Sequence, residues 1–371
     1  RLQPGLFCGL DHLVSGFRAV MKWGVWTYDL PLDRCRIFGE EQADRRNGVM
    51  VSVRDGSGSW WLEIGPVSVF DGPQVEDLAW WGAVWAENWA RELPLSRIRT
   101  SLLEAACPNP VLGTLSGTWL LGMMAKRAYG RGFRRRVWLT ALLELADDRE
   151  QDIRGRVERM ARAGYRYVKV KVREADPDTA VEAIRAIRLI LGPRCQVRVD
   201  VNASWPREAV EFLACRALLP EPGMAPVMYL EDPFSGNQAG EEFPWPVPLA
   251  LDTWTCLRHG IPRETGWKGP LRWGVWKPFV SWSIRQRMAE RDWSVTVSSA
   301  CESGVGVAAL AVLSLEGNLA RGVGLGSYRW LSEDVLKSRL PIVDQPWVEL
   351  RDLLWASQRV MTGRLTLRYD G

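Results

Sequence analysis

Histidine and paired cysteine motifs are scarce in this chain. Only two of the 371 residues are histidines, His12 and His259. The seven cysteines are odd in number and scattered, and no two of them form a Cys-x-x-Cys pair. These gaps argue against a zinc site, a histidine-based metal site and a disulfide framework. They are typical of a reducing compartment, so we expect a cytoplasmic protein, in which any metal would be a hard cation held by carboxylates.

Long apolar runs and a strong net charge are also missing. No run reaches the roughly 18 apolar residues of a membrane-spanning helix, so we expect no membrane partner. The formal charge is only +4, which predicts no nucleic-acid partner but suits a small anionic substrate. The basic run at residues 126–136 is short and no aromatic stacking platform accompanies it, so we interpret it as a solvated connection between domains.

The first third of the chain predicts a separate α+β domain. Residues 1–20 fit no pattern and are expected to form an N-terminal extension. The α+β domain would then cover residues 21–126, with a polar segment at 38–47 as a mobile loop that could act as a lid. Its expected strands and helices lie at residues 23–32, 48–54 and 59–64, and at 74–92 and 112–126, respectively.

From residue 137 onward, apolar strand patterns alternate with helical patterns. This alternation predicts parallel strands with helical crossovers, and eight repeats favour a closed barrel over an open sheet. We expect the barrel to occupy residues 127–330 and residues 331–371 to pack back on the first domain. The expected strands are 137–143, 167–172, 197–201, 227–231, 249–252, 273–277, 294–298 and 322–325.

Charged residues stand at the ends of five consecutive expected strands. Lys169 and Lys171 alternate with valines, so both ammonium groups should point to one side of their strand. The next strands end in Asp200, Glu231, Asp252 and Lys277. In barrels of this kind the carboxyl ends of the strands form the active site, so these side chains should converge.

The converging charges predict metal-assisted proton abstraction. Three carboxylates at one place repel one another unless a cation neutralises them, and an oxygen-only set fits Mg²⁺, with Mn²⁺ as an alternative. Such a metal could hold a substrate carboxylate and stabilise the enediolate formed when the α-proton leaves. Lys171 and Lys277 would flank this site, and nearby cations would lower the pKa of a lysine enough for it to act as a base.

The motifs resemble those of the enolase superfamily, in its muconate-lactonizing-enzyme-like branch. The resemblance rests on Lys169-Val170-Lys171, Asp200-Val201-Asn202, Glu231-Asp232-Pro233, Asp252 and Lys277-Pro278. It implies a (β/α)7β TIM-like barrel with an N-terminal α+β capping domain. It also implies Asp200, Glu231 and Asp252 as metal ligands and Lys171 and Lys277 as catalytic residues, as in the lysine-plus-magnesium sites of that superfamily.

Within that branch the chain resembles the o-succinylbenzoate synthase family. The segments that carry this likeness are residues 21–32, 298–306 and 324–328. The resemblance implies syn dehydration of 2-succinyl-6-hydroxy-2,4-cyclohexadiene-1-carboxylate to o-succinylbenzoate, on the route to menaquinone or phylloquinone. It further implies a small-molecule carboxylate substrate, contacted by Lys169, Asn202, Ser298, Ser299, Glu302 and Ser303.

Two departures from the family pattern bear on the site. Thr253 follows Asp252 where a glutamate is usual, which removes a carboxylate beside the expected metal ligand. Residues 279–282 replace the usual glycines after Lys277-Pro278, which predicts a narrower pocket there.

Other functions remain open from the sequence. N-acylamino-acid racemases and dipeptide epimerases need a base on each face of the substrate, and Lys171 with Lys277 would serve. No Asp-x-Asp motif occurs between Ser298 and Tyr328, which disfavours the dipeptide epimerase. A non-catalytic scaffold protein would be expected to lose a ligand or a lysine. The oligomeric state, monomer or homo-oligomer, is left open.

Overall fold

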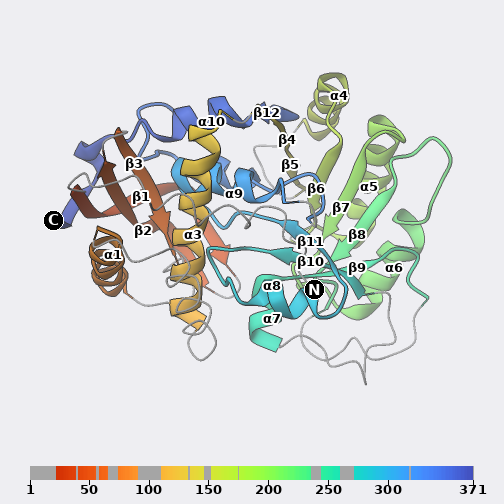
Figure 1. Cartoon of the computed structure of the whole chain (residues 1–371). Helices are drawn as coiled ribbons and strands as arrows, with labels where there is room; N and C mark the ends of the chain where they lie inside the picture. Colours follow the sequence, from red (N-terminus) through yellow and green to blue (C-terminus); the bar gives the residue numbers. More distant parts are fainter. Residues whose placement is uncertain are drawn as a thin grey trace.

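The computed structural model describes residues 22–38, 41–55, 58–65, 74–90, 110–132, 134–145, 152–173, 175–234, 244–259, 271–316 and 319–370. Figure 1 shows an antiparallel sheet with helices at one side of the molecule and a barrel of strands and helices at the other. The expected N-terminal extension, residues 1–20, lies outside the described residues.

The antiparallel sheet has the strand order β13-β1-β2-β3. Strand β1 (Lys22–Phe38) pairs along nearly its whole length with β2 (Glu41–Asp55), which in turn pairs with β3 (Gly58–Ile64). The hairpin expected between residues 48–54 and 59–64 is confirmed. The last strand, β13 (Thr366–Asp370), comes from the C-terminus of the chain and adds to the free edge of β1.

The mobile loop expected at residues 38–47 is wrong. Strand pairing runs from Phe38 opposite Glu41 to Asp29 opposite Asn47, so residues 41–47 belong to β2. The segment is rich in polar side chains, which is typical of a loop, but its backbone pairs with β1. On the surface of the two strands, the Arg45 side chain forms an ion pair with Asp29. Residues 39–40 lie outside the described residues. Because residues 41–47 are part of a paired strand, the structure does not support a lid formed by them.

Two helices pack against this sheet. The structure places α1 at Val75–Ala90 and α3 at Pro110–Gly130, which confirms the helices expected at residues 74–92 and 112–126. Gly117 of α3 permits a close approach to the loop after the sixth barrel strand, because a Cβ there would lie 2.0 Å from the Trp282 ring. None of the described helices combines the length and apolarity needed to cross a bilayer.

Seven parallel strands of the barrel lie side by side in sequence order. Their bounds are β5 (Ala141–Glu144), β6 (Tyr167–Lys171), β7 (Gln196–Asp200), β8 (Val227–Glu231), β9 (Leu249–Asp252), β10 (Leu271–Trp276) and β11 (Ser294–Val297). The eighth expected strand closes the ring through two bridges, because Val323 pairs with Leu139 and Gly324 pairs with Ser298. The closed parallel barrel expected from the alternating pattern is confirmed.

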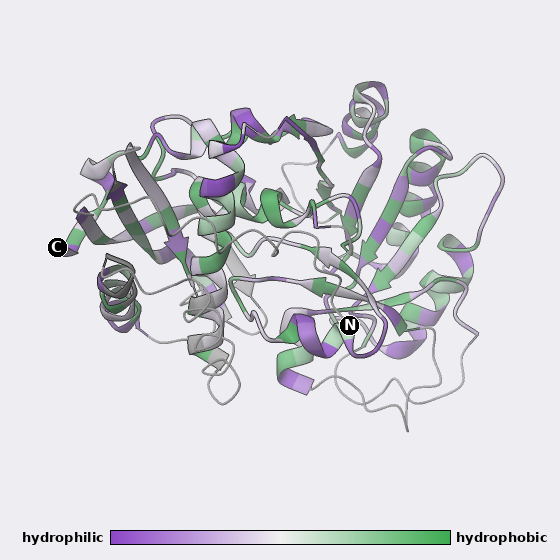
Figure 2. Cartoon of the chain, viewed as in Figure 1, coloured by the Kyte–Doolittle hydropathy of each residue, from purple (hydrophilic) through white to green (hydrophobic). Residues whose placement is uncertain are grey.

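Helices connect the barrel strands and cover them from outside. They are α4 (Ile153–Ala163), α5 (Pro177–Leu191), α6 (Arg207–Ala217), α7 (Thr253–His259), α8 (Ile284–Ala289) and α9 (Gly304–Leu313). Local sequence sets their ends: Asp176 accepts a hydrogen bond from Thr179 N and precedes Pro177 at the start of α5. Figure 2 shows hydrophilic and hydrophobic residues side by side on α4 and α5, as expected of helices with one face on the barrel.

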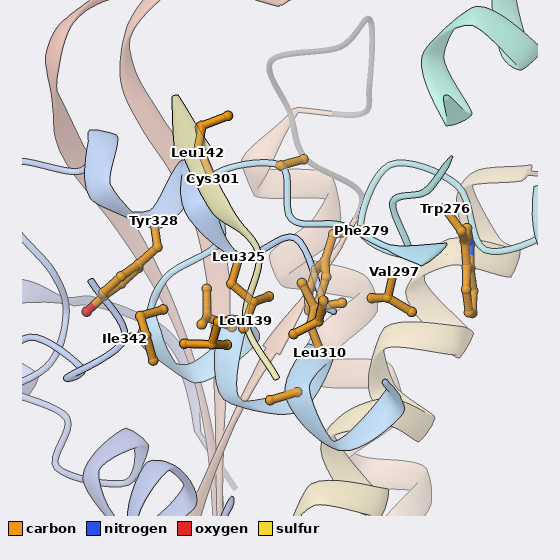
Figure 3. Close-up of a cluster of buried hydrophobic side chains, with 14 of the residues drawn as sticks. Leu139, Leu142, Trp276, Phe279, Val297, Cys301, Leu310, Leu325, Tyr328 and Ile342 are labelled. Atoms are coloured by element: carbon orange, nitrogen blue, oxygen red, sulfur yellow. The ribbon is translucent and has the colours of Figure 1, made fainter. Parts of the chain in front are cut away.

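Helix α9 differs, because every one of its residues is buried. It packs between the barrel, α3, β3 and α10 (Leu350–Ser357). Figure 3 shows Leu310 of this helix in a cluster of buried side chains that also holds Leu139 and Leu325. Both lie where the eighth strand closes the barrel, since Leu139 pairs with Val323 and Leu325 follows Gly324. This helix therefore joins the core of the barrel to that of the antiparallel sheet.

Further short elements follow the eighth barrel strand toward the C-terminus. A short 3-10 helix (Gly326–Trp330) follows the eighth strand, and β12 (Trp347–Glu349) pairs with β4 (Arg136–Trp138). A second 3-10 helix (Thr362–Arg364) leads into β13. The domain boundaries proposed from the sequence, at residues 126/127 and 330/331, remain a prediction.

Candidate active site and metal centre

A cavity of about 350 Å³ lies at the carboxyl ends of the barrel strands. Its size falls in the range of pockets that hold small molecules. Side chains that bear on its chemistry come from β6, β9, β10 and the loops after β7, β8 and β11; these are Lys169, Lys171, Asn202, Asp232, Asp252, Lys277, Ser298 and Ser299. The strand ends singled out in the sequence therefore meet at one place.

Lys169 is held by two carboxylates. Val168 and Val170 are fully buried, so the alternation along β6 turns Lys169 and Lys171 toward the cavity. The Lys169 ammonium lies 2.8 Å from Asp200 Oδ2 and 2.8 Å from Glu231 Oε1. Burial acts to lower its pKa, but the two carboxylates outweigh burial and raise the pKa of Lys169 above its usual value. Lys169 is therefore a fixed positive charge.

Lys171 has a different environment. Its Nζ lies 3.9 Å from Asp200 Oδ2, beyond hydrogen-bond distance, and 5.4 Å from the centre of the Trp330 ring. Burial lowers the pKa of Lys171, the Asp200 carboxylate opposes this, and the ammonium groups of Lys169 and Lys277 lower it further. The net shift is downward, as a general base requires.

Lys277 is paired with Asp252. Its Nζ donates a hydrogen bond to Asp252 Oδ2, and although burial opposes the shift, this carboxylate raises the pKa of Lys277. Thr253 supports the pair: its Oγ1 accepts a hydrogen bond from Lys277 N at 2.8 Å and donates one to Val275 O at 3.1 Å. The threonine that replaces the usual glutamate therefore ties the end of β10 to the end of β9.

Three buried carboxylates form a group that could hold a metal ion. Asp200, Glu231 and Asp232 each offer an oxygen within 4.8 Å of the others. Among the described residues, the buried Glu231 Oε2 has no hydrogen-bond partner, and burial with the nearby Asp200 raises the pKa of Glu231 to about 7. An all-carboxylate set with an unsatisfied oxygen fits a hard divalent cation such as Mg²⁺.

This group shares Asp200 and Glu231 with the triad expected from the sequence and adds Asp232, while Asp252 as the third ligand stays a prediction. Both oxygens of Asp252 are engaged, Oδ2 with Lys277 and Oδ1 with Thr255 N at 2.9 Å. Asp232 has a left-handed backbone (φ 43°), and its Oδ1 accepts from Asp252 N at 3.0 Å, which keeps the two residues in contact. Asp252 therefore stands beside the group and completes a cluster of four acids.

Four of the expected substrate contacts line the cavity: Lys169, described above, and Asn202, Ser298 and Ser299. Asn202 donates its backbone N–H to Asp200 Oδ1 at 2.9 Å, and both Asn202 and Ala203 have a φ of 52°. Consecutive non-glycine residues with the left-handed backbone conformation are strained, and such backbone strain is common at functional sites. Ser298 and Ser299 both donate to Gly324 O, which anchors the wall of the cavity to the eighth strand.

Glu302 and Ser303, also expected to contact substrate, lie elsewhere. Neither lines the cavity. Glu302 is fully buried and turns its Oε2 back to Ala300 N at 2.7 Å. Ser303 donates its N–H and its hydroxyl to Glu63 of β3 at 3.0 and 2.6 Å. The loop after β11 thus points Ser298 and Ser299 into the cavity and the next residues toward the antiparallel sheet.

Glu302 should make stability depend on pH. Burial and the neighbouring Glu63 raise the pKa of Glu302 from 4.5 to about 7. Because the folded-state pKa is the higher one, this contribution to stability is full below about pH 4.5 and is lost as the pH rises through 7. In Glu302→Gln, the free energy of unfolding should decline less over this pH interval than it does in the wild type. Urea titration at a series of pH values would measure it. Glu158→Gln serves as the control, because the Glu158 side chain is 43% exposed. An unchanged dependence of stability on pH in Glu302→Gln would contradict the assignment.

Sequence reasoning missed several residues of the cavity wall. Arg173, Trp254, Arg258 and Trp330 line it. Arg173 had a usable signal, since it continues the alternation of Lys169 and Lys171. Residues 279–282, expected to narrow the pocket, do not line it: Phe279 is fully buried, and the Trp282 backbone N–H donates to Thr114 of α3.

Comparisons with known proteins agree with this architecture. The family model described as Enolase C-terminal domain-like matches residues 152–252. The o-succinylbenzoate synthase of Mycobacterium marinum is 30% identical over 221 residues, which cover 56% of this chain and 61% of that protein. The chain thus spans about three fifths of the length of this relative. The o-succinylbenzoate synthase of Haemophilus influenzae is 24% identical over 88% of this chain and 97% of that protein.

Solved structures show the same fold at low identity. A dipeptide epimerase from Enterococcus faecalis V583, complexed with Mg and the dipeptide L-Leu-L-Tyr, superposes with a TM-score of 0.62 at 14% identity over 94% of this chain and 99% of that one. A muconate lactonizing enzyme from Pseudomonas fluorescens, complexed with muconolactone, gives 0.54 at 17% identity over 88% and 93%. These neighbours share the fold expected from the sequence, a capped (β/α)7β barrel, and the family model assigns residues 152–252 to the Enolase C-terminal domain-like family.

Proposed function

We propose that this enolase-superfamily enzyme is an o-succinylbenzoate synthase. The reaction would be the syn dehydration of 2-succinyl-6-hydroxy-2,4-cyclohexadiene-1-carboxylate, a lyase step in the cytoplasm on the route to menaquinone or phylloquinone. The names of the curated relatives support this proposal, although they are only 21% to 30% identical. The arrangement of the lysines in the cavity supports it independently.

The observation that carries the proposal is the unequal pairing of Lys171 and Lys277. Lys277 donates a hydrogen bond to Asp252, whereas Lys171 has no carboxylate within 3.5 Å among the described residues. One lysine is therefore held as a cation, and the other is suited to exchange a proton. An elimination in which one group removes and returns the proton needs this asymmetry, whereas a racemase needs a base on each face.

The residues divide the proposed reaction among them. Lys171 removes the proton from the carbon next to the ring carboxylate, and Lys277 balances the negative charge that develops on that carboxylate. The C–O bond of the ring hydroxyl then breaks, and Lys171 returns its proton to the departing hydroxide, which leaves as water. A bound Mg²⁺, held by Asp200 and Glu231 with Asp232 or Asp252, would polarise the substrate carboxylate and stabilise the enediolate.

The direct test is turnover of the cyclohexadiene carboxylate by the purified protein with Mg²⁺. We expect loss of the diene absorbance with stoichiometric appearance of o-succinylbenzoate, identified by chromatography. The same assay with EDTA should show no turnover above the background rate. Absence of turnover in a folded, Mg²⁺-loaded protein would reject the synthase assignment and leave the superfamily membership standing.

N-acylamino-acid racemisation is the second candidate, because both lysines reach one cavity from different strands. It predicts exchange of the α-proton of N-acylamino acids for deuterium in heavy water, starting from either enantiomer. If only dehydration is seen, the racemase is excluded. If exchange occurs at a comparable kcat/KM, the site supports both reactions.

A further inference from the structure

Three cations follow one another on the cavity side of β6 and its extension. Lys169, Lys171 and Arg173 alternate with Val170 and Val172, which are fully buried. Strand β6, in which alternate residues share a side, ends at Lys171, and Arg173 stands in the turn that follows, in which Ala175 N donates to Val172 O at 2.9 Å. All three side chains line the same cavity.

The three cations differ in what they contact. Lys169 is bound by two carboxylates, and Lys171 lies 3.9 Å from one. The half-buried Arg173 guanidinium makes no hydrogen bond or ion pair with another residue in the part of the chain that the structure describes. Its backbone is nevertheless fixed, since Arg173 O accepts hydrogen bonds from Ser204 Oγ and Trp205 Nε1, both at 3.2 Å. A half-buried arginine on a fixed backbone therefore lines the cavity, and its guanidinium donors have no partner among the described residues.

A second arginine lies on the same cavity wall. Arg258 of α7 lines the cavity, and its guanidinium stacks 4.9 Å from the centre of the Trp254 ring, which also lines it. Arg258 is exposed, whereas Asp232 and Asp252 are only 3% exposed. Asp232 and Asp252 therefore lie in the buried part of the cavity wall, and Arg258 lies where the wall meets solvent.

We propose that Arg173, assisted by Arg258, binds a second anionic group of the substrate, so that the site is built for a dicarboxylate. The planar guanidinium matches a carboxylate with two parallel hydrogen bonds, a geometry that a lysine cannot provide. One carboxylate of the ligand would lie at the acidic cluster and the other at the two arginines. This assignment rests on the proposed function and identifies the arginines as the residues that recognise the succinyl carboxylate.

Binding of two matched ligands tests the proposal without turnover. The probes are o-succinylbenzoate and 2-butyrylbenzoate, in which a methyl group replaces the distal carboxylate. Dissociation constants are measured with Mg²⁺ by calorimetry for the wild type, Arg173→Ala, Arg258→Ala and the control Arg272→Ala. Arg272 is an exposed arginine near the start of β10, at the opposite end of the barrel.

We expect Arg173→Ala to weaken o-succinylbenzoate about 10- to 100-fold, as loss of a hydrogen-bonded charge predicts, and to leave 2-butyrylbenzoate within about twofold of wild type. Arg258→Ala should produce a smaller loss that is again confined to the dicarboxylate. Arg272→Ala should change neither constant. In turnover, Arg173→Ala should raise KM and leave kcat within a small factor.

Three results would overturn the subsite. In the first, the wild type binds the two ligands equally or binds neither. In the second, Arg173→Ala binds both ligands with wild-type affinity. In the third, Arg173→Ala loses affinity for both ligands by the same factor. A wild type that prefers the dicarboxylate through Arg173 but does not dehydrate the cyclohexadiene would refute the synthase and retain the subsite. A protein that dehydrates the cyclohexadiene but whose preference for the dicarboxylate does not depend on Arg173 would retain the synthase and refute the subsite.

Discussion

Replacement of Lys171 by alanine should lower kcat for the proposed dehydration by about 10²- to 10⁴-fold, the range expected for loss of a positioned general base. The reason lies in its surroundings: Lys171 is half-buried, has no hydrogen-bonded carboxylate among the described residues, and has the ammonium groups of Lys169 and Lys277 nearby. Since a general base must be neutral, the rate should fall as the pH drops below the pKa of Lys171. The downward shift of that pKa places the decline below the usual range of lysine.

Arginine substitutions separate a base from a fixed charge. Arginine keeps the positive charge but does not deprotonate in proteins. Lys171→Arg should therefore be as inactive as Lys171→Ala, whereas Lys277→Arg should retain measurable turnover because Lys277 already acts as a cation beside Asp252. Steady-state kinetics over a pH series would measure this difference. If Lys171→Arg kept activity within tenfold of the wild type, Lys171 would not be the base.

Replacement of Glu63 by alanine should lower the free energy of unfolding by about 3–5 kcal/mol, as expected when one partner of a buried ion pair is removed. The Glu63 carboxylate accepts from Arg46 and Tyr28 at 3.2 and 2.5 Å, and from Ser303 and Gly306 at the start of α9. Arg46 is only 1% exposed. Its charge would be left buried without a partner, and urea denaturation would report the loss.

The neighbouring arginine supplies a matched control. Arg45, also on β2, pairs with Asp29 of β1 at 2.6 Å, but their side chains are 49% and 52% exposed. Asp29→Ala should therefore cost about 0–1 kcal/mol. The double variant Glu63→Leu with Arg46→Met should recover part of the stability, because it removes both buried charges together. Equal losses for Glu63→Ala and Asp29→Ala would show that the buried network contributes no more than a surface pair.

The pattern of the sequence was sufficient for most of the fold. Apolar runs of four to six residues that alternate with amphipathic helices have few solutions, and the parallel barrel with its order of strands is one of them. The hairpin arm at residues 36–43 was not predictable in the same way. Its sequence places Ile37 and Phe38 next to each other and then continues with Gly39 and polar residues, so the alternation that marks a half-buried strand is absent, and only the pairing of residues 36–38 with 41–43 defines it.

For the site, the sequence by itself determined which charged residues meet. Lys171, Asp200, Glu231 and Lys277 end strands of one parallel barrel, and the carboxyl ends of such strands share one edge. Only the tertiary structure decided how these charges pair. It placed Asp232 with the acids, tied Asp252 to Lys277, turned Glu302 and Ser303 toward Glu63, and left Arg173 open to the cavity. Spacing along a strand sets the side to which a residue points, whereas its partners come from neighbouring elements whose positions depend on the packing of the whole chain.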